Sequence, residues 1–343
     1  MLSTKSYFGR GHVPVGIGAV LRGWDMTEKE FRKGLGVVDF RAMTGACPRD
    51  CFFCFTDKRK RTLTLEEIKR VIDEIAEMGA RAIDFLGEGE PTVDKFFFDI
   101  IGHTANRGLI PVVFTEAAAR MRNRDFVKRV KEIGATVCPK CDSLFDAEYQ
   151  NRVVGDKKGT YFSRRNEAIE VLIDEGFNQT NPDGTTRLGF DMVVSTRNIH
   201  EVPATLRYCR ERNIWVVFSF YLPAGRSARD TFDRSLHASE EQKRKMREAV
   251  LAIDREFGFD HTIWSNFGTT PCVERMQIYG DGRVSPCPGN EMVVGTVQEF
   301  SIRELHQKLL ARFPGHDPAR FDGHCLYRPS IPGVHPVHLH RNI

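Results

Sequence analysis

Three cysteines lie close together early in the sequence and share one short segment. Cys47, Cys51 and Cys54 have the spacing C-x3-C-x2-C, which places three thiolates on one tight loop. Three thiolates can bind three irons of a [4Fe–4S] cube and leave the fourth iron without a protein ligand. A bidentate small molecule can chelate that iron and receive an electron, much as a substrate takes the open position of a catalytic zinc. The spacing therefore predicts a reactive metal cluster.

Zinc and a chance grouping of buried cysteines are the other interpretations of this loop. Zinc usually takes a fourth Cys or His at closing distance. No histidine lies between residues 13 and 102, and the next cysteine along the chain is Cys138. Phe53, before the third cysteine, is placed to shield a cluster or to stack on a nucleobase. These features favour the cluster over both alternatives.

The remaining cysteines and the composition describe the setting of the loop. Nine cysteines, an odd number with one tight group, favour metal ligation in a reducing cytoplasm over disulfides. The net charge is only +4, which does not suggest a nucleic-acid or membrane-surface binder. We find no apolar run long enough to span a membrane and no signal peptide. We therefore expect a cytoplasmic protein with neither a nucleic-acid partner nor a membrane partner.

The elements that must position the loop alternate between short apolar runs and amphipathic stretches. Val37–Met43 is an expected strand that leads into the cysteines. Thr64 and Glu67 form a T-x-x-E capping box that opens a helix to about Met78. About six β-then-α units follow one another from residue 36 to residue 257, which predicts a parallel sheet with right-handed crossovers. We expect an α/β protein with an open, partial (β/α)6 TIM-like barrel.

Two motifs in this setting resemble the radical S-adenosylmethionine (radical SAM) superfamily. The first is C-x3-C-x-aromatic-C after the first strand, and the second is the segment Gly87-Glu88-Gly89-Glu90-Pro91 after the second strand. The second is similar to the family's GGEP segment, with Glu88 in place of the middle glycine. The resemblance implies that the methionyl amine and carboxylate of S-adenosylmethionine chelate the open iron. Electron transfer then yields a 5′-deoxyadenosyl radical that abstracts hydrogen.

The resemblance also implies further cofactor contacts. The expected S-adenosylmethionine-binding residues are Phe53, Gly87, Glu88, Gly89, Glu90, Pro91, Ser143 and Ser195. Loop residues from Pro223 to Arg226 are expected over the adenine. Charged and polar groups at strand ends are the candidate catalytic, substrate-contacting residues: Glu116, Lys140, Asp191, Tyr221 and Arg226. For Cys138 and Cys141 we expect a role in packing or facing the substrate, and for Cys209 a place in the core.

Residues 258–343 differ in character and carry three more cysteines. Cys272 and Cys287 flank two short expected strands joined by a Gly-Asp-Gly turn, and Cys325 follows later. This pattern resembles a small α+β SPASM or twitch extension, which implies an auxiliary [4Fe–4S] cluster. Three cysteines allow at most one such cluster, with an open iron or a ligand such as His324. A vestigial or zinc-binding domain is the alternative. The expected domains are thus residues 1–35 packed on the barrel, 36–257 and 258–343.

The leading functional interpretation is a radical SAM oxidoreductase. It would abstract hydrogen from a small metabolite, such as a sugar or cyclitol, with the auxiliary cluster assisting an oxidation. The resemblance implies a reducing partner such as flavodoxin or ferredoxin. A maturase that modifies a peptide or protein side chain is one alternative. A non-catalytic protein that binds zinc or a cluster on the same barrel is the other.

Overall fold

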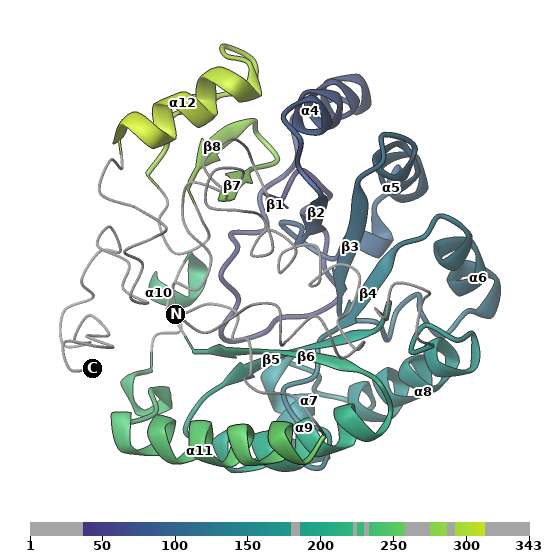
Figure 1. Cartoon of the computed structure of the whole chain (residues 1–343), viewed down its shortest axis with the longest axis vertical. Helices are drawn as coiled ribbons and strands as arrows, with labels where there is room; N and C mark the ends of the chain where they lie inside the picture. The colour runs from purple at the N-terminus through teal and green to yellow at the C-terminus, as the bar shows by residue number, and fades with distance from the viewer. Residues whose placement is uncertain are drawn as a thin grey trace. The chain divides into compact units, whose positions relative to one another are not determined.

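Strands and helices alternate along the described part of the chain in the computed structural model (Figure 1). The structure describes residues 37–179, 186–221, 225–229, 233–257, 275–286 and 292–312. The chain divides into two compact units. Unit 1 comprises residues 1–18, 47–57 and 112–264, and unit 2 comprises residues 19–46, 58–111 and 265–343. Each unit contains parallel strands followed by helices, which confirms the expected α/β class.

Unit 2 contains a sheet in the strand order β2-β1-β7-β8-β9. Strand β1 pairs in parallel with β2 and with β7, and the β7–β8 and β8–β9 pairs are antiparallel. All four residues of β1 and of β2 are buried, as is usual in parallel strands covered on both faces. The bounds are β1 Val37–Phe40, β2 Ala82–Phe85, β7 Arg275–Ile278, β8 Arg283–Ser285 and β9 Gly295–Thr296.

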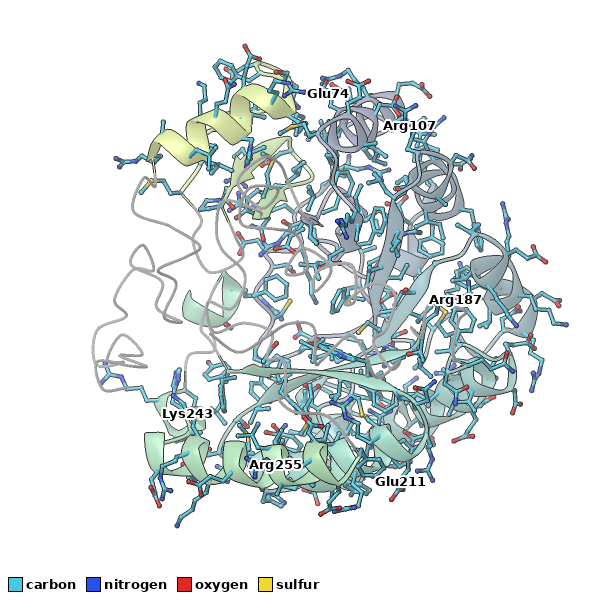
Figure 2. All side chains as sticks on the ribbon, viewed as in Figure 1. Glu74, Arg107, Arg187, Glu211, Lys243 and Arg255 are labelled. Atoms are coloured by element: carbon cyan, nitrogen blue, oxygen red, sulfur yellow. The ribbon has the colours of Figure 1, made fainter. Side chains whose placement is uncertain are left out.

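Three α-helices of unit 2 belong to the described part of the chain: α4 Leu65–Glu77, α5 Phe97–Asn106 and α12 Ile302–Arg312. The capping box is confirmed, because Thr64 accepts from the Glu67 amide and Glu67 accepts from the Thr64 amide. Glu74, whose side chain is labelled on α4 in Figure 2, also accepts a hydrogen bond from the Ile302 amide at 2.7 Å. A carboxylate at the first amide of α12 is favoured by the helix dipole.

Unit 1 contains two parallel strand pairs. Strands β3 and β4 pair over the part of β3 that follows Pro111, and β5 pairs with β6 along its whole length. The bridges Val137–Leu188 and Lys140–Asp191 join β4 to β5. The bounds are β3 Ile110–Thr115, β4 Thr136–Pro139, β5 Gly189–Val194 and β6 Trp215–Phe220.

The helices of unit 1 follow these strands. They are α6 Arg124–Glu132, α7 Ala147–Val153, α8 Tyr161–Asp174, α9 Val202–Glu211, α10 Arg226–Arg229 and α11 Glu240–Glu256. Helix α11 begins with a second capping box, between Ser239 and Gln242. Helix α7 was not expected from the sequence. Asp146 caps it by accepting from the Tyr149 amide at 2.8 Å, and it brings Val153 and Val154 to the cysteine loop.

The chain after residue 258 shares a sheet with the first strand, because β7 lies beside β1. The domain boundaries at residues 35 and 257 remain a prediction, and residues 1–35 lie outside the described residues. Among the helices that the structure describes, none is long and apolar enough to cross a membrane.

Candidate iron–sulfur cluster site

Cys47, Cys51 and Cys54 lie together on the loop after β1, and all three are partly exposed. They are close enough to interact, since the charges of Cys47 and Cys54 each affect the pKa of Cys51. Within the described ranges, no three His, Cys, Asp or Glu side chains are grouped to hold a single metal ion. A [4Fe–4S] cube takes its thiolates at separate irons, so its ligands need not converge on one point. Three accessible thiols on one loop fit such a cube.

The backbone of this loop is anchored to the end of α7. The Asp50 amide donates to the Val154 carbonyl at 3.0 Å, and the Phe52 amide donates to the Val153 carbonyl at 3.2 Å. Phe53 is buried and packs in one apolar cluster with Val153 and Val154. Phe53 therefore packs the cysteine loop against the end of α7. Its expected role in shielding a cluster remains a prediction.

An ion pair ties the loop to the end of β3. Arg49 Nε donates to Glu116 Oε2 at 2.6 Å, and both side chains are largely buried. The Arg49 guanidinium also lies 4.7 Å from the centroid of the Tyr161 ring, and the Tyr161 hydroxyl donates to the Glu116 carbonyl. Glu116, expected to contact substrate, thus binds the cysteine loop in this structure.

A second arginine, Arg226 at the start of α10, holds the loop from the chain after β6. Arg226 forms a 2.6 Å ion pair with Asp50 and donates to the Cys51 carbonyl at 2.9 Å. Gly225 before it has a φ of +53°, and a Cβ there would overlap the Phe55 carbonyl. Glycine is required for both reasons. Arg226, predicted to cover adenine, therefore contacts the loop directly, whereas Pro223 and Ala224 lie outside the described residues.

Lys140 and Asp191 form a charged group beside the loop. Lys140 Nζ lies 3.2 Å from Asp142 Oδ1 and 3.6 Å from Asp191 Oδ2. It also lies 4.5 Å from the centroid of the Phe53 ring. Burial raises the pKa of the Cys51 thiol to about 12, and the Lys140 charge opposes this shift. Lys140 is therefore close enough to stabilise a thiolate on the cluster loop.

The protonation states of this group follow from burial and pairing. Burial alone would lower the pKa of Lys140, yet the two carboxylates hold it above its usual value, so Lys140 is cationic. Burial raises the pKa of Asp191, and Lys140 only partly offsets the rise. The Asp191 side chain remains a quarter exposed, at 25%. The structure thus brings together two of the five predicted substrate-contacting residues, one cation and one carboxyl of raised pKa.

The two serines expected to bind S-adenosylmethionine are buried. The Ser143 hydroxyl donates to Glu201 at 2.7 Å and accepts from the Asp146 amide at 2.8 Å. The Ser195 hydroxyl lies 3.2 Å from the Tyr149 hydroxyl and 3.2 Å from Asn198 Oδ1. Both hydroxyls therefore have partners within the protein, and their contacts with the cofactor remain a prediction.

The Gly87–Pro91 segment lies against the chain that precedes Cys47. The Gly89 amide donates to the Thr44 carbonyl at 2.9 Å, and the Glu90 amide donates to the Ala46 carbonyl at 2.8 Å. A Cβ on Gly89 would overlap the Ala46 carbonyl. Pro91 begins a short 3₁₀ turn, in which Glu90 accepts from the Thr92 amide. Strand β2 thus places this segment beside Thr44 and Ala46, which precede Cys47 in the sequence.

Glu88, which departs from the family's glycine, is buried and paired. Its carboxylate lies 3.8 Å from the Arg41 guanidinium, and each side chain is only 2% exposed. Arg41 also lies 5.0 Å from the centroid of the Tyr279 ring, on the residue after β7. A carboxylate at residue 88 is thus accommodated because a buried arginine faces it.

Tyr221, another candidate residue, is buried in the same apolar cluster as Phe53. Tyr221 follows β6, and its ring lies 5.0 Å from the His237 ring. Cys138, Cys141 and Cys209 are fully buried. Cys209 thus lies in the core as expected, and for Cys138 and Cys141 a role in packing or in facing the substrate remains a prediction. The expected ligands of an auxiliary cluster lie outside the described residues: Cys272, Cys287, Cys325 and His324.

The cysteine loop and strands β2 to β5 fall inside the region that matches one family model. Residues 42–209 match the sequence model of the Radical SAM superfamily. The chain contains a radical SAM domain. A PqqA peptide cyclase of Bradyrhizobium diazoefficiens is 22% identical over 80% of this chain and 72% of its own length. A GTP 3′,8-cyclase of Vibrio parahaemolyticus is 28% identical over 54% of each chain, and the match to it spans about half of that relative.

Solved structures share the fold of this chain. One is anSMEcpe with bound AdoMet and a Cp18Cys peptide, with a TM-score of 0.61, 16% identity, and coverage of 83% of this chain and 81% of that one. Another is Streptococcus suis SuiB, with a TM-score of 0.62, 14% identity, and coverage of 80% and 66%. These matches confirm the partial-barrel fold. The cofactors of the family are a [4Fe–4S] cluster and S-adenosylmethionine.

Sequence reasoning missed two residues that shape this candidate site. Arg49 and Asp142 were not singled out, although Arg49 pairs with Glu116 and Asp142 with Lys140. Arg49 lies between two of the cysteines, and this position was the available signal. Asp142 lies next to Cys141 and two residues after Lys140, and no local pattern distinguishes it from a surface acid.

Proposed function

We propose that this radical SAM enzyme holds its cluster on Cys47, Cys51 and Cys54 and oxidises a small, hydroxyl-bearing metabolite such as a sugar or cyclitol. When bound, the cluster and S-adenosylmethionine supply a 5′-deoxyadenosyl radical that takes a hydrogen atom from the substrate. The Gly87–Pro91 backbone, Phe53, Ser143 and Ser195 are the proposed contacts of S-adenosylmethionine. A reduced flavodoxin or ferredoxin is the proposed electron source.

The pairing of Asp191 with Lys140 carries the oxidation proposal. The two groups lie 3.6 Å apart, with Asp191 inside β5 and Lys140 directly after β4, and Lys140 lies beside Phe53 of the cysteine loop. A general base works best when its pKa lies near the working pH, and burial moves the pKa of Asp191 upward in that direction. Asp191 would accept the hydroxyl proton of the substrate, while Lys140 would hold the oxygen that becomes a carbonyl.

The proposed oxidation removes two hydrogens and two electrons from a carbinol. A hydrogen atom leaves the carbon, a proton leaves the oxygen to Asp191, and one further electron leaves the substrate. An auxiliary cluster on Cys272, Cys287 and Cys325 is the proposed acceptor of that electron. This acceptor requires a twitch-like domain after residue 257, which is part of the proposal. We also propose that residues 1–35 pack on the barrel.

Modification of a peptide side chain is the second candidate function. It is supported by the PqqA peptide cyclase relative, which matches over 80% of this chain, and by the fold shared with peptide-bound anSMEcpe. SuiB has also been solved with the precursor peptide SuiA. The Asp191–Lys140 pair suits a polar side chain as well as a metabolite, so the two candidates differ in substrate rather than in the proposed base.

Anaerobic reconstitution followed by metal analysis tests the cluster assignment. We expect about four irons from the radical SAM cluster and about four more if the auxiliary cluster forms. Cys47→Ala should abolish 5′-deoxyadenosine formation under dithionite, whereas Cys209→Ala, at a buried cysteine away from the loop, should retain it. Zinc without iron would contradict the proposal and support a non-catalytic zinc protein.

Trapping the substrate hydrogen distinguishes the two candidate functions. Candidate polyols and peptides carrying deuterium at carbon would be incubated with the reconstituted enzyme. Transfer of deuterium into 5′-deoxyadenosine from a polyol, with formation of a carbonyl product, is the expected result. Transfer from a peptide alone would instead establish the second candidate.

A further inference from the structure

The Cys54 side chain has hydrogen-bonding partners of its own. Its sulfur lies 3.2 Å from the hydroxyl of Thr56, a residue that is only 5% exposed. The sulfur also lies 3.8 Å from the Thr56 carbonyl, to which a free thiol can donate. As a metal ligand the sulfur is a thiolate and can only accept. In that state the Thr56 hydroxyl is the donor of the 3.2 Å bond.

Arg226 brings a cation to the same sulfur. The charges of Arg226 and Cys54 are close enough to interact, and the guanidinium donates to the Cys51 carbonyl at 2.9 Å. The chain following it is fixed too, because the Ser227 amide donates to the Cys54 carbonyl at 3.0 Å. Arg226 is held at Cys54 by its pairing with Asp50 and by the turn at Gly225. The cation beside the sulfur is thus positioned by the fold.

We propose that Thr56, by donating a hydrogen bond to the Cys54 thiolate, and Arg226, by its nearby positive charge, set the reduction potential of the cluster. The inference rests on the proposed ligation by Cys54 and adds two positioning residues to it. Donors to a ligand sulfur disperse its negative charge, and the reduced cluster carries one negative charge more than the oxidised one. Such bonds therefore favour reduction and raise the potential.

Thr56→Val provides the sharpest test because it replaces the hydroxyl by a methyl group of similar size. Cluster content should match that of the wild type, and the potential from an EPR-monitored redox titration should be lower. Thr56→Ser, which keeps the hydroxyl, should restore the wild-type potential. Thr136→Val makes the same exchange at a buried threonine on β4 and should leave the potential unchanged. Arg226→Lys keeps the positive charge but loses the planar guanidinium. We therefore expect a smaller decrease in the reduction potential than in Thr56→Val.

The outcomes distinguish this inference from the proposed function. A wild-type protein that assembles no cluster would contradict the proposed function itself. A cluster that forms in both the wild type and Thr56→Val with the same potential would overturn only the role of Thr56. A decrease in Thr56→Val that Thr56→Ser fails to reverse would indicate a packing effect and would also reject the hydrogen bond.

Discussion

Arg49, between the first two cysteines of the loop, donates to Glu116 at 2.6 Å across 67 residues of sequence. Glu116 accepts from the Ala119 amide as well, so the end of β3 fixes this carboxylate. The pair lies against the Tyr161 ring and is largely shielded from water. Its geometry holds the loop in place, and Glu116 is therefore better explained as an anchor of the cluster loop than as a substrate contact.

Glu116→Gln should loosen this anchor. The amide keeps the shape of the side chain but leaves the Arg49 charge without its carboxylate. Hydrogen bonds to charged groups contribute about 1.5–3 kcal/mol, so we expect the free energy of unfolding to fall by about 2 kcal/mol. Iron content after reconstitution should fall with it. Urea denaturation and iron analysis of the purified variant measure the two effects.

Glu148→Gln is the matched control for this prediction. Glu148 pairs with Arg152 at 3.7 Å, but its side chain is 87% exposed. Exposed pairs contribute about 0–1 kcal/mol, so this variant should keep both its stability and its iron. An equal loss in both variants would show that the Arg49–Glu116 pair has no special role.

Asp191→Asn should separate stability from activity. Because burial raises the folded pKa of Asp191 above its unfolded value, ionisation at residue 191 opposes folding. The protonated Asp191 carboxyl contributes fully to stability below the ordinary pKa of aspartate. This contribution is lost as the pH rises through the raised pKa of Asp191 in the folded protein. Asparagine does not ionise. We therefore expect the variant to gain stability relative to the wild type across that range and to keep the gain at neutral pH.

Urea melts from about pH 4 to about pH 7 measure this difference in stability. Substrate turnover should be lost in Asp191→Asn while slow 5′-deoxyadenosine formation persists, since the proposed base acts after hydrogen abstraction. Asp174→Asn, at an exposed carboxylate paired with Arg124, should change neither property. Full turnover by Asp191→Asn would exclude Asp191 as the base.

Gly225→Ala tests the turn that brings Arg226 to the loop. The φ of +53° disfavours a side chain by about 1–2 kcal/mol, and the new Cβ would overlap the Phe55 carbonyl next to Cys54. We expect lower stability and incomplete cluster assembly, measured by thermal melting and iron analysis. Gly102→Ala adds the same methyl group to α5, where no atom lies within 4 Å, and should stabilise by about 0.5–1 kcal/mol. Normal iron content in Gly225→Ala would refute the steric argument.

Much of the fold could be predicted because its signals are local. The Thr64–Glu67 capping box, the apolar face of α4 and the buried run of β6 are all encoded within a few residues, and the structure contains each of them. Helix α7 was missed because seven residues hold too little of a 3.6-residue period to be recognised. The spacing of the three cysteines is a local signal of the same kind, and it indicates the candidate site directly.

The contacts around the loop could not be predicted because they depend on tertiary register. The ion pairs Arg49–Glu116 and Lys140–Asp191 form only when the strands that carry these residues have packed together. The hydroxyl of Ser143 is an instructive case. Its sequence context suggested a cofactor contact, but in the structure it donates to Glu201, which lies 58 residues away. Local patterns identify residue types, whereas pairing partners follow from the packing of the chain.

The buried pair of Arg41 and Glu88 gives the last prediction. Arg41→Met would leave the Glu88 carboxylate at 2% exposure without the arginine that faces it, and losing one partner of a buried pair destabilises by about 3–5 kcal/mol. The double variant Arg41→Met/Glu88→Leu removes both charges and should recover much of that loss. Arg107→Met, in an exposed pair with Asp73, should change stability by less than about 1 kcal/mol. Urea denaturation measures all three variants. If Arg41→Met unfolds like the Arg107 variant, the pair does not explain why glutamate is accommodated at residue 88.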